Sequence, residues 1–295
     1  MNHTQLMAFA AVAEAGGFTK AAERLMVSQP AVSLQVGELE ARLGVSLFHR
    51  LPRGVKLTSA GQTLLGYARQ IASLERDAEA AMAELIGVQR GRLTIGASHT
   101  IGTYLLPAVL GTFRQQYLQI ELSLEIANTT QVEAMLLESA VDLAFTEGSV
   151  RDANLRGELI TEDQLVPVAP AKHPLLSRKR ITAEMLCREP LILREEGSGT
   201  REVFEAALAK LKLHVKPIMS LSSTEAIKRA VAGGIGLTVI SRLSLDTELK
   251  AGALAIVPVA DLTIKRPLRL LRQRTGTDSP AAAAFLKTLR GSLSR

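Results

Sequence analysis

The sequence predicts an α/β multidomain protein with a helical N-terminal domain, one long connecting helix and a larger domain in which strands and helices alternate. Three observations predict this fold. Apolar residues recur at helical spacing through the first 43 positions, an unbroken amphipathic pattern follows from Ser59, and short apolar strands alternate with helices from Gly91 onward. With 295 residues, 47% of them hydrophobic, the chain is long enough for two or three packed domains.

The first domain, placed at residues 1–58, is predicted to contain three helices and a small hairpin, or wing. Thr19 is expected to cap the second helix and Ser28 the third, with Pro30 in the first turn of the third, where a missing N–H costs nothing. This arrangement is typical of a winged helix-turn-helix, whose second motif helix enters the major groove of DNA. The helices are expected over residues 4–15, 20–25 and 29–43, and the hairpin over 47–57.

Uncharged hydrogen-bonding side chains gather at the N-terminal end of the third helix. Gln can form two hydrogen bonds to adenine, and Ser can bond a base or a phosphate. A capped surface helix with ordinary polar residues is the alternative. The candidate DNA contacts are Ser28, Gln29, Pro30, Ser33 and Gln35, together with Thr19. A positive cluster in the wing, made of His49, Arg50, Arg53 and Lys56, suits phosphate contact, or is a solvated turn.

A long helix is predicted from Ser59 to about Ile86, within a connecting segment placed at residues 59–90. Thr58 is its expected cap, and its apolar stripe includes Leu65 and Ile71. A helix of this length is unusual in a globular domain, which indicates that it pairs with another helix.

In the third region, residues 91–295, hydroxyl-bearing residues follow strands and open helices. A helix N-terminus with free N–H groups and small hydroxyl side chains is suited to bind an anion, although Ser and Thr are also the ordinary N-caps. Two such helix starts, one in each half of the region, could hold one small anion. The candidate effector contacts are Ser98, His99, Thr100, Thr129, Thr130, Thr146, Gly197, Ser198, Gly199, Thr200, Ser222 and Thr224.

Composition and motifs exclude several other classes of protein. Aromatic residues make up 3% of the chain, with no Trp, which argues against a protein that stacks sugars or single-stranded nucleic acid. The single Cys and five dispersed His predict no metal site, and no nucleophile elbow, P-loop or dinucleotide fingerprint is present. We therefore expect that the protein is not an enzyme and that it binds no cofactor. Short apolar runs and the absence of a secretory signal predict a cytoplasmic protein without membrane contact.

The bulk charge does not locate the DNA-binding end, because the first 90 residues carry 9 Lys+Arg and 8 Asp+Glu although the whole chain is +6. The local motifs are more specific. The sequence resembles the LysR-type transcriptional regulators in an ordered series of elements: Ala21-Ala22-Glu23-Arg24-Leu25, Ser28-Gln29-Pro30-Ala31-Val32-Ser33, Leu39-Glu40, Leu43-Gly44, Leu47-Phe48 and Leu57-Thr58-Ser59-Ala60-Gly61. Gly37 departs from the larger residue usual in this family.

The resemblance implies that residues 28–35 form the recognition helix, that Arg53 lies in the wing, and that the long helix builds a homodimer, often extended to a tetramer. It also implies a two-lobed effector domain like that of periplasmic binding proteins. We place lobe I at 91–162 and 265–295, and lobe II at 163–264.

Within the family, the segments Gly96–Gly102 and Gly197–Arg201 look most like regulators of sulfur assimilation and of carbon fixation. The expected partners are therefore double-stranded DNA, a second copy of the chain, RNA polymerase and a small anionic effector. An oxidised sulfur anion is the first candidate effector, and a phosphorylated or carboxylated metabolite is the second. A small-molecule binding protein without a regulatory role, such as a transport protein, is the rival class.

Overall fold

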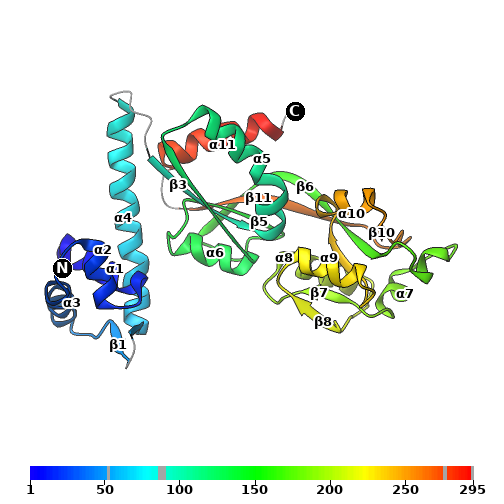
Figure 1. Ribbon diagram of the computed structural model, residues 1–295, viewed down its shortest axis with the longest axis horizontal. Coiled ribbons are helices and arrows are strands. Elements are labelled where there is room, and N and C mark those ends of the chain that lie inside the picture. Colours follow the sequence, from blue (N-terminus) through cyan, green and yellow to red (C-terminus); the bar gives the residue numbers. More distant parts are fainter. Residues whose placement is uncertain (52–53, 86–90, 275–277, 294–295) are drawn as a thin grey trace. The chain divides into compact units, whose positions relative to one another are not determined.

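The computed structural model describes residues 1–51, 54–85, 91–274 and 278–293, and its α/β multidomain architecture agrees with the prediction. Two compact units are present. The N-terminal unit contains helices α1 to α4 and a hairpin, and the second unit contains the strands and helices that follow (Figure 1). The N-terminal elements are α1 His3–Ala15, α2 Phe18–Leu25, α3 Gln29–Leu43, β1 Phe48–Arg50, β2 Val55–Leu57 and α4 Ser59–Leu85.

Caps and glycines define the ends of these helices. The Ser28 side chain accepts a hydrogen bond from the Ala31 amide at the start of α3, and Gly44 ends that helix with φ 70°. The expected cap at Thr19 is wrong. Gly17 is the residue before α2, and Thr19 lies inside the first turn, because the helix begins at Phe18.

The core of the N-terminal unit is built around Phe9, whose ring lies 5.3 Å from that of Phe48. The Glu40 carboxylate accepts hydrogen bonds from the Leu47 and Phe48 amides and so ties α3 to the hairpin. The first part of α4 belongs to the same core, because Leu65 is only 9% exposed.

The second unit alternates strands and helices, as the sequence predicted. The expected helix over residues 101–116 is present. It begins with a turn of π-helix over Ile101–Leu105, which continues directly into α5 at Leu106. The elements are β3 Gly91–Ser98, α5 Leu106–Gln116, β4 Ile120–Ala127, α6 Thr129–Leu137, β5 Leu143–Glu147, β6 Leu155–Pro170, α7 Ala183–Cys187, β7 Ile192–Arg194, α8 Gly199–Lys210, β8 Met219–Leu221, α9 Thr224–Ala232, β9 Thr238–Ser241, α10 Asp246–Lys250, β10 Leu254–Ile256, β11 Ile264–Gln273 and α11 Pro280–Leu293.

The main sheet has the order β10-β6-β11-β5-β3-β4, with β9 also paired to β6. Strand β3 is parallel to β4 and β5, whereas β11 is antiparallel to β5 and β6. Strands β7 and β8 form a separate parallel pair. Strand β11 pairs along its whole length with residues 155–165 of β6, and the rest of β6 pairs with β9 and β10, so these two long strands run from one part of the sheet to the other (Figure 1).

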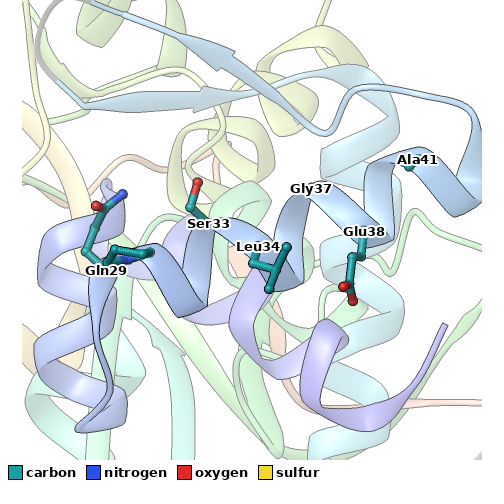
Figure 2. Close-up of a pocket in the computed structure, with 7 residues that line it drawn as sticks. Gln29, Ser33, Leu34, Gly37, Glu38 and Ala41 are labelled. Atoms are coloured by element: carbon teal, nitrogen blue, oxygen red, sulfur yellow. The ribbon is translucent and has the colours of Figure 1, made fainter.

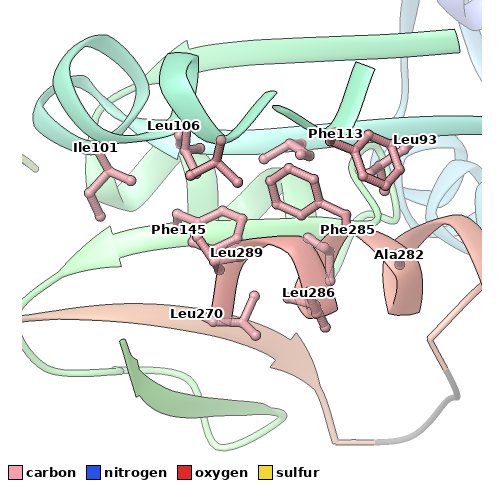
Figure 3. Close-up of a cluster of buried hydrophobic side chains, with 14 of the residues drawn as sticks. Leu93, Ile101, Leu106, Phe113, Phe145, Leu270, Ala282, Phe285, Leu286 and Leu289 are labelled. Carbon is pink, nitrogen blue, oxygen red and sulfur yellow. The ribbon is translucent and has the colours of Figure 1, made fainter. Parts of the chain in front are cut away.

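Separate hydrophobic cores define two lobes in this unit. In lobe I, α5 and α11 cover the sheet and contribute Phe113 and Phe285, which pack with Phe145 of β5 (Figure 3). Lobe II has its own cores around Phe204 and Ile227. Strand β11 supplies residues to both lobes, and the expected chain crossings near residues 163 and 265 fall on β6 and β11.

Candidate functional site

The outward face of α3 carries a shallow depression of about 690 Å³. Three of the predicted DNA contacts, Gln29, Pro30 and Ser33, line it, and Figure 2 shows Gln29 and Ser33 side chains projecting from the helix. Ser28 acts as the helix cap, and Gln35 is half-buried and is not part of the lining. The opposite face of α3 buries Val32, Val36 and Leu39 in the core.

The wing lies against the turn between α1 and α2. The Val55 amide donates to the Gly16 carbonyl at 3.2 Å, and a Cβ on Gly54 would meet that carbonyl at 2.7 Å. His49 and Lys56 are opposite each other on the two strands, and both are exposed. Thr19 is exposed beside this turn. Arg53 and the side chain of Arg50 lie outside the described residues.

The exposed apolar residues of α4 differ in part from those predicted. Leu65 packs into the core of the N-terminal unit and is therefore unable to face a partner. Tyr67, Ile71, Leu74 and Met82 are exposed at intervals of three, four or eight residues, so they lie along one side of the helix.

At the junction of the two lobes, Arg266 of β11 is completely buried and bonds to both lobes. Its Nη2 donates to Thr100 Oγ1 at 3.0 Å, and its Nη1 donates to Thr200 Oγ1 at 2.8 Å. Thr100 directly precedes the π-helical turn of lobe I, whereas Thr200 lies in the first turn of α8 in lobe II. The two predicted helix starts are therefore brought together around one guanidinium group.

Two buried carboxylates lie beside this guanidinium. Asp163 Oδ2 accepts from Arg266 Nε at 2.8 Å, and Glu147 Oε1 lies 3.5 Å from Nη1. Asp163 also accepts from Ser241 Oγ at 3.0 Å. A buried ion pair needs such additional hydrogen bonds to offset the cost of removing its charges from water.

A second direct contact joins α6 of lobe I to α8 of lobe II. The Gly199 amide donates to Thr129 Oγ1 at 3.2 Å, and the Thr130 amide donates to the Gly197 carbonyl at 3.2 Å. A Cβ on Gly199 would meet Thr129 Oγ1 at 2.8 Å and the Glu147 carbonyl at 3.0 Å, so only glycine permits this approach.

Of the other predicted effector contacts, some are buried near the junction of the lobes and others are exposed on the surface. Within the described chain, neither Thr100 nor Ser198 caps its helix with its side chain, whereas Ser223 caps α9. Ser98 Oγ is buried and has no hydrogen-bond partner among the described residues, which leaves a hydroxyl for a ligand to satisfy. Thr146 is buried within β5, and Ser222 is exposed.

Charged groups beside the junction affect His99. Burial and the nearby Arg194 guanidinium lower the pKa of His99, and Glu195 and Glu147 partly oppose this effect. Arg194 is itself buried, pairs with Glu195 at 2.8 Å and donates to Thr224 Oγ1 at 3.4 Å. The imidazole is therefore biased towards its neutral form.

A tyrosine bridges the lobes near the same helix starts. Tyr104 Oη donates to Glu225 Oε1 at 2.6 Å, and burial raises the pKa of Tyr104 to about 12. Lys228 also pairs with Glu225 and lies 5.6 Å from the centre of the Tyr104 ring. This contact links the π-helical turn of lobe I to α9 of lobe II.

Sequence reasoning missed Arg266 and Asp163. The available signal was the alternation of Ile264, Arg266 and Leu268, which places the arginine on the inward face of its strand.

Among the described residues, no cluster of His, Cys, Asp or Glu could hold a metal ion. None of the described helices is both long and apolar enough to span a bilayer.

Comparison with known families covers nearly the whole chain. Residues 3–62 match the model of the bacterial regulatory helix-turn-helix protein of the lysR family, and residues 87–294 match that of the LysR substrate binding domain. The transcriptional activator CmpR of Synechocystis is 39% identical over 97% of this chain and 93% of its own length. The RuBisCO operon transcriptional regulator of Allochromatium vinosum is 37% identical, with 95% and 93% covered, and CysL of Bacillus subtilis is 34% identical, with 98% and 97% covered.

Two solved structures show the same architecture. A full-length OxyR variant of Pseudomonas aeruginosa matches with a TM-score of 0.78 and 25% identity, covering 99% of this chain and 94% of that protein. The regulatory domain of Synechocystis CcmR, solved in complex with 2-PG, matches with a TM-score of 0.65 and 30% identity, covering 70% of this chain and 99% of that domain.

Proposed function

Since the chain belongs to the LysR family of DNA-binding transcriptional regulators, we propose that a small anion bound where Thr100 and Thr200 meet controls its action on DNA. The single observation that carries this proposal is the pair of hydrogen bonds from Arg266 to these two hydroxyls. The two threonines come from different lobes, so a ligand that binds both favours one arrangement of the lobes.

The hydroxyl chemistry supports an anionic ligand. Each threonine oxygen accepts from Arg266, so its own proton is not used in that bond and can be donated to a ligand. Hydrogen bonds to a charged acceptor are stronger than neutral ones. Arg266 is itself engaged with Asp163, so its role is to position the hydroxyls rather than to bind the anion. The unpartnered Ser98 Oγ, two residues before Thr100, adds a third donor.

The relatives favour a phosphorylated carboxylic acid as the effector class. CcmR was solved with 2-PG, which is 2-phosphoglycolate, and a regulator of a RuBisCO operon is among the relatives. An oxidised sulfur anion, the first expectation from sequence, is the second candidate, because CysL is also a relative. The phosphorylated class comes first because the related CcmR domain was solved with such a ligand.

For the DNA-binding end, we propose that α3 enters the major groove with Gln29 and Ser33 against base edges. The lining of the α3 depression supports this assignment, because both side chains project from the exposed face. Ser28, Pro30 and Gln35 would position the helix start, and Thr19, Arg50 and Arg53 would contact phosphates beside it.

The proposal also includes a homodimer paired through α4, extended to a tetramer by the second unit, that acts in the cytoplasm and contacts RNA polymerase. Exposed apolar residues along one side of α4 support the pairing. A dimer would place two α3 helices on half-sites about one helical turn apart, or a multiple of it.

A ligand screen followed by footprinting tests the proposal. The full-length protein is melted with 2-phosphoglycolate, glycolate, inorganic phosphate, sulfite and sulfate. An effector at 100 times its Kd should stabilise the native state by about 2.7 kcal/mol. That ligand should also change the protected pattern on the DNA upstream of the gene. If none of the five anions shifts the melting temperature, the proposed effector class is wrong, whereas the regulator assignment rests on separate evidence.

A further inference from the structure

The exposed face of α3 has an apolar stripe beside its polar residues. Pro30, Leu34, Gly37 and Ala41 follow one another at intervals of three or four residues and line the same depression as Gln29 and Ser33. Leu34 is 60% exposed, and Figure 2 shows its side chain directed away from the helix. A Cβ on Gly37 would meet no atom within 4 Å in the described structure, so the bare backbone beside Leu34 is open to an approaching surface.

A single exposed leucine is common on protein surfaces and by itself indicates nothing. The position of Leu34 is more informative, because it is next to Ser33 in sequence and lines the same depression as Gln29, the two residues assigned to base edges. In the major groove the one apolar group on a base edge is the 5-methyl group of thymine. An apolar stripe that enters this groove is therefore complementary to thymine.

Charge favours the N-terminal half of the stripe as the reading end. Glu38 lines the other end of the depression, and Gln5 Nε2 holds its carboxylate with a hydrogen bond of 3.0 Å to Oε2. A carboxylate fixed at this position repels DNA phosphates, whereas the helix N-terminus attracts them. The duplex therefore approaches closest near Gln29 and Leu34.

We propose that Leu34 is a specificity-determining residue that selects thymine by packing against its 5-methyl group, next to a base contacted by Gln29 or Ser33. This inference rests on the proposed entry of α3 into the major groove. The polar residues are unable to provide a preference for thymine over uracil, because the two bases offer the same hydrogen-bonding groups and differ only in the methyl group. We therefore assign this preference to Leu34.

Deoxyuridine substitution tests the contact one methyl group at a time. A duplex is first selected from a random pool by the full-length protein, and each thymine is then replaced by deoxyuridine in one half-site. Wild-type protein should lose affinity about fourfold at one or two positions, which corresponds to about 0.8 kcal/mol for a buried methyl group. The L34A variant should bind the thymine and deoxyuridine duplexes equally at those positions, and L34M should retain the preference.

Leu43 provides the matched control, because it lies on the same helix, is 41% exposed and does not line the depression. L43A should discriminate as wild type does. If no position shows a methyl effect that depends on Leu34, the inference is wrong. The Q29A variant distinguishes failure of this inference from failure of the proposed entry of α3 into the major groove. A loss of affinity in Q29A without coupling at Leu34 overturns only this inference, whereas full affinity in Q29A overturns the placement of α3 as well.

Discussion

Thr100 and Thr200 accept hydrogen bonds from the same guanidinium group, although they belong to different lobes. The Thr100 side chain does not cap the π-helical turn that follows it, and Thr200 lies inside α8, whose N-cap residue is Ser198. This shared donor makes the relative position of the lobes sensitive to any ligand that competes for, or adds to, these bonds.

Removal of the Thr100 hydroxyl should weaken effector binding. T100V keeps the shape of the side chain and deletes both the hydroxyl proposed to bind the ligand and the acceptor of the Arg266 bond, so calorimetry should show at least a tenfold lower affinity. Thr103 is exposed on the same π-helical turn, and T103V is the matched control. Equal effector affinities for T100V, S198A and wild type would place the effector elsewhere.

Replacement of Arg266 should destabilise the second unit. R266M leaves Asp163 buried without its cation, which typically costs about 3–5 kcal/mol. The double variant R266M/D163N should recover part of this loss, because it removes the uncompensated charge. Chemical denaturation measures both effects, and R178M, at an exposed arginine, is the control. Additive losses in the double variant would show that the two groups are not coupled.

The lowered pKa of His99 makes stability depend on pH. Well above pH 6.5 the imidazole is neutral in both folded and unfolded chains. As pH falls below 6.5, the unfolded chain takes up a proton that folded His99 resists, so the free energy of unfolding decreases until the folded group also titrates. H99Q should therefore lose less thermal stability between pH 7.5 and 5.5 than wild type. H214Q, at an exposed histidine, should follow the wild-type curve. Parallel curves for H99Q and wild type would contradict this linkage.

Charges on the exposed side of α4 should separate the proposed dimer. I71E and L74E place carboxylates where apolar surface would be buried, and light scattering should show monomer at micromolar concentration. DNA affinity should fall at the same time, because two half-sites would no longer be bound together. Q62E adds the same charge near the helix start without removing an apolar group. A stable I71E/L74E dimer would rule out this face.

Two glycines of α4 should respond in opposite ways to alanine. A Cβ on Gly61 would lie 2.2 Å from the Leu47 carbonyl, so G61A should lower the melting temperature of the N-terminal unit. A Cβ on Gly66 would meet nothing within 4 Å in the described structure, so G66A should stabilise the helix by up to about 1 kcal/mol. Similar melting temperatures for the two variants would contradict the close packing at Gly61.

Local chemistry explains which parts of the fold were predictable. The cap at Ser28 and the alternation of strands and helices depend on neighbouring residues, and both were confirmed. The helix over residues 101–116 was also predicted, whereas its π-helical first turn was not, because five residues are too few for apolar periodicity to distinguish a π-helix from an α-helix. Similarly, Leu65 fits a helical stripe, but only the tertiary structure shows that this position faces α4's own domain.

Some residues of the junction between the lobes were predictable from sequence, because they too follow a local pattern. Hydroxyls at helix starts can be recognised locally, so Thr100 and Thr200 were identified from sequence. Arg266 and Asp163 come from strands far apart in the chain, and an arginine in a strand is usually exposed. The alternation along β11 marks Arg266 as inward-facing, but its ion pair with Asp163 depends on the pairing between β6 and β11, which no local pattern specifies.

The ribbon of β6 and β11 also determines how the lobes can move. Between residues 265 and 267 of β11 the two strands are paired only with each other, whereas β5 pairs with β11 from Leu268 onward and β9 pairs with β6 from Leu165 onward, so we expect the ribbon to bend most easily in this short stretch. Arg266 lies within this stretch and bonds to both lobes. We therefore expect a ligand bound at the junction to act where the ribbon bends, so that a small change in the angle between the lobes moves their far ends by a larger distance.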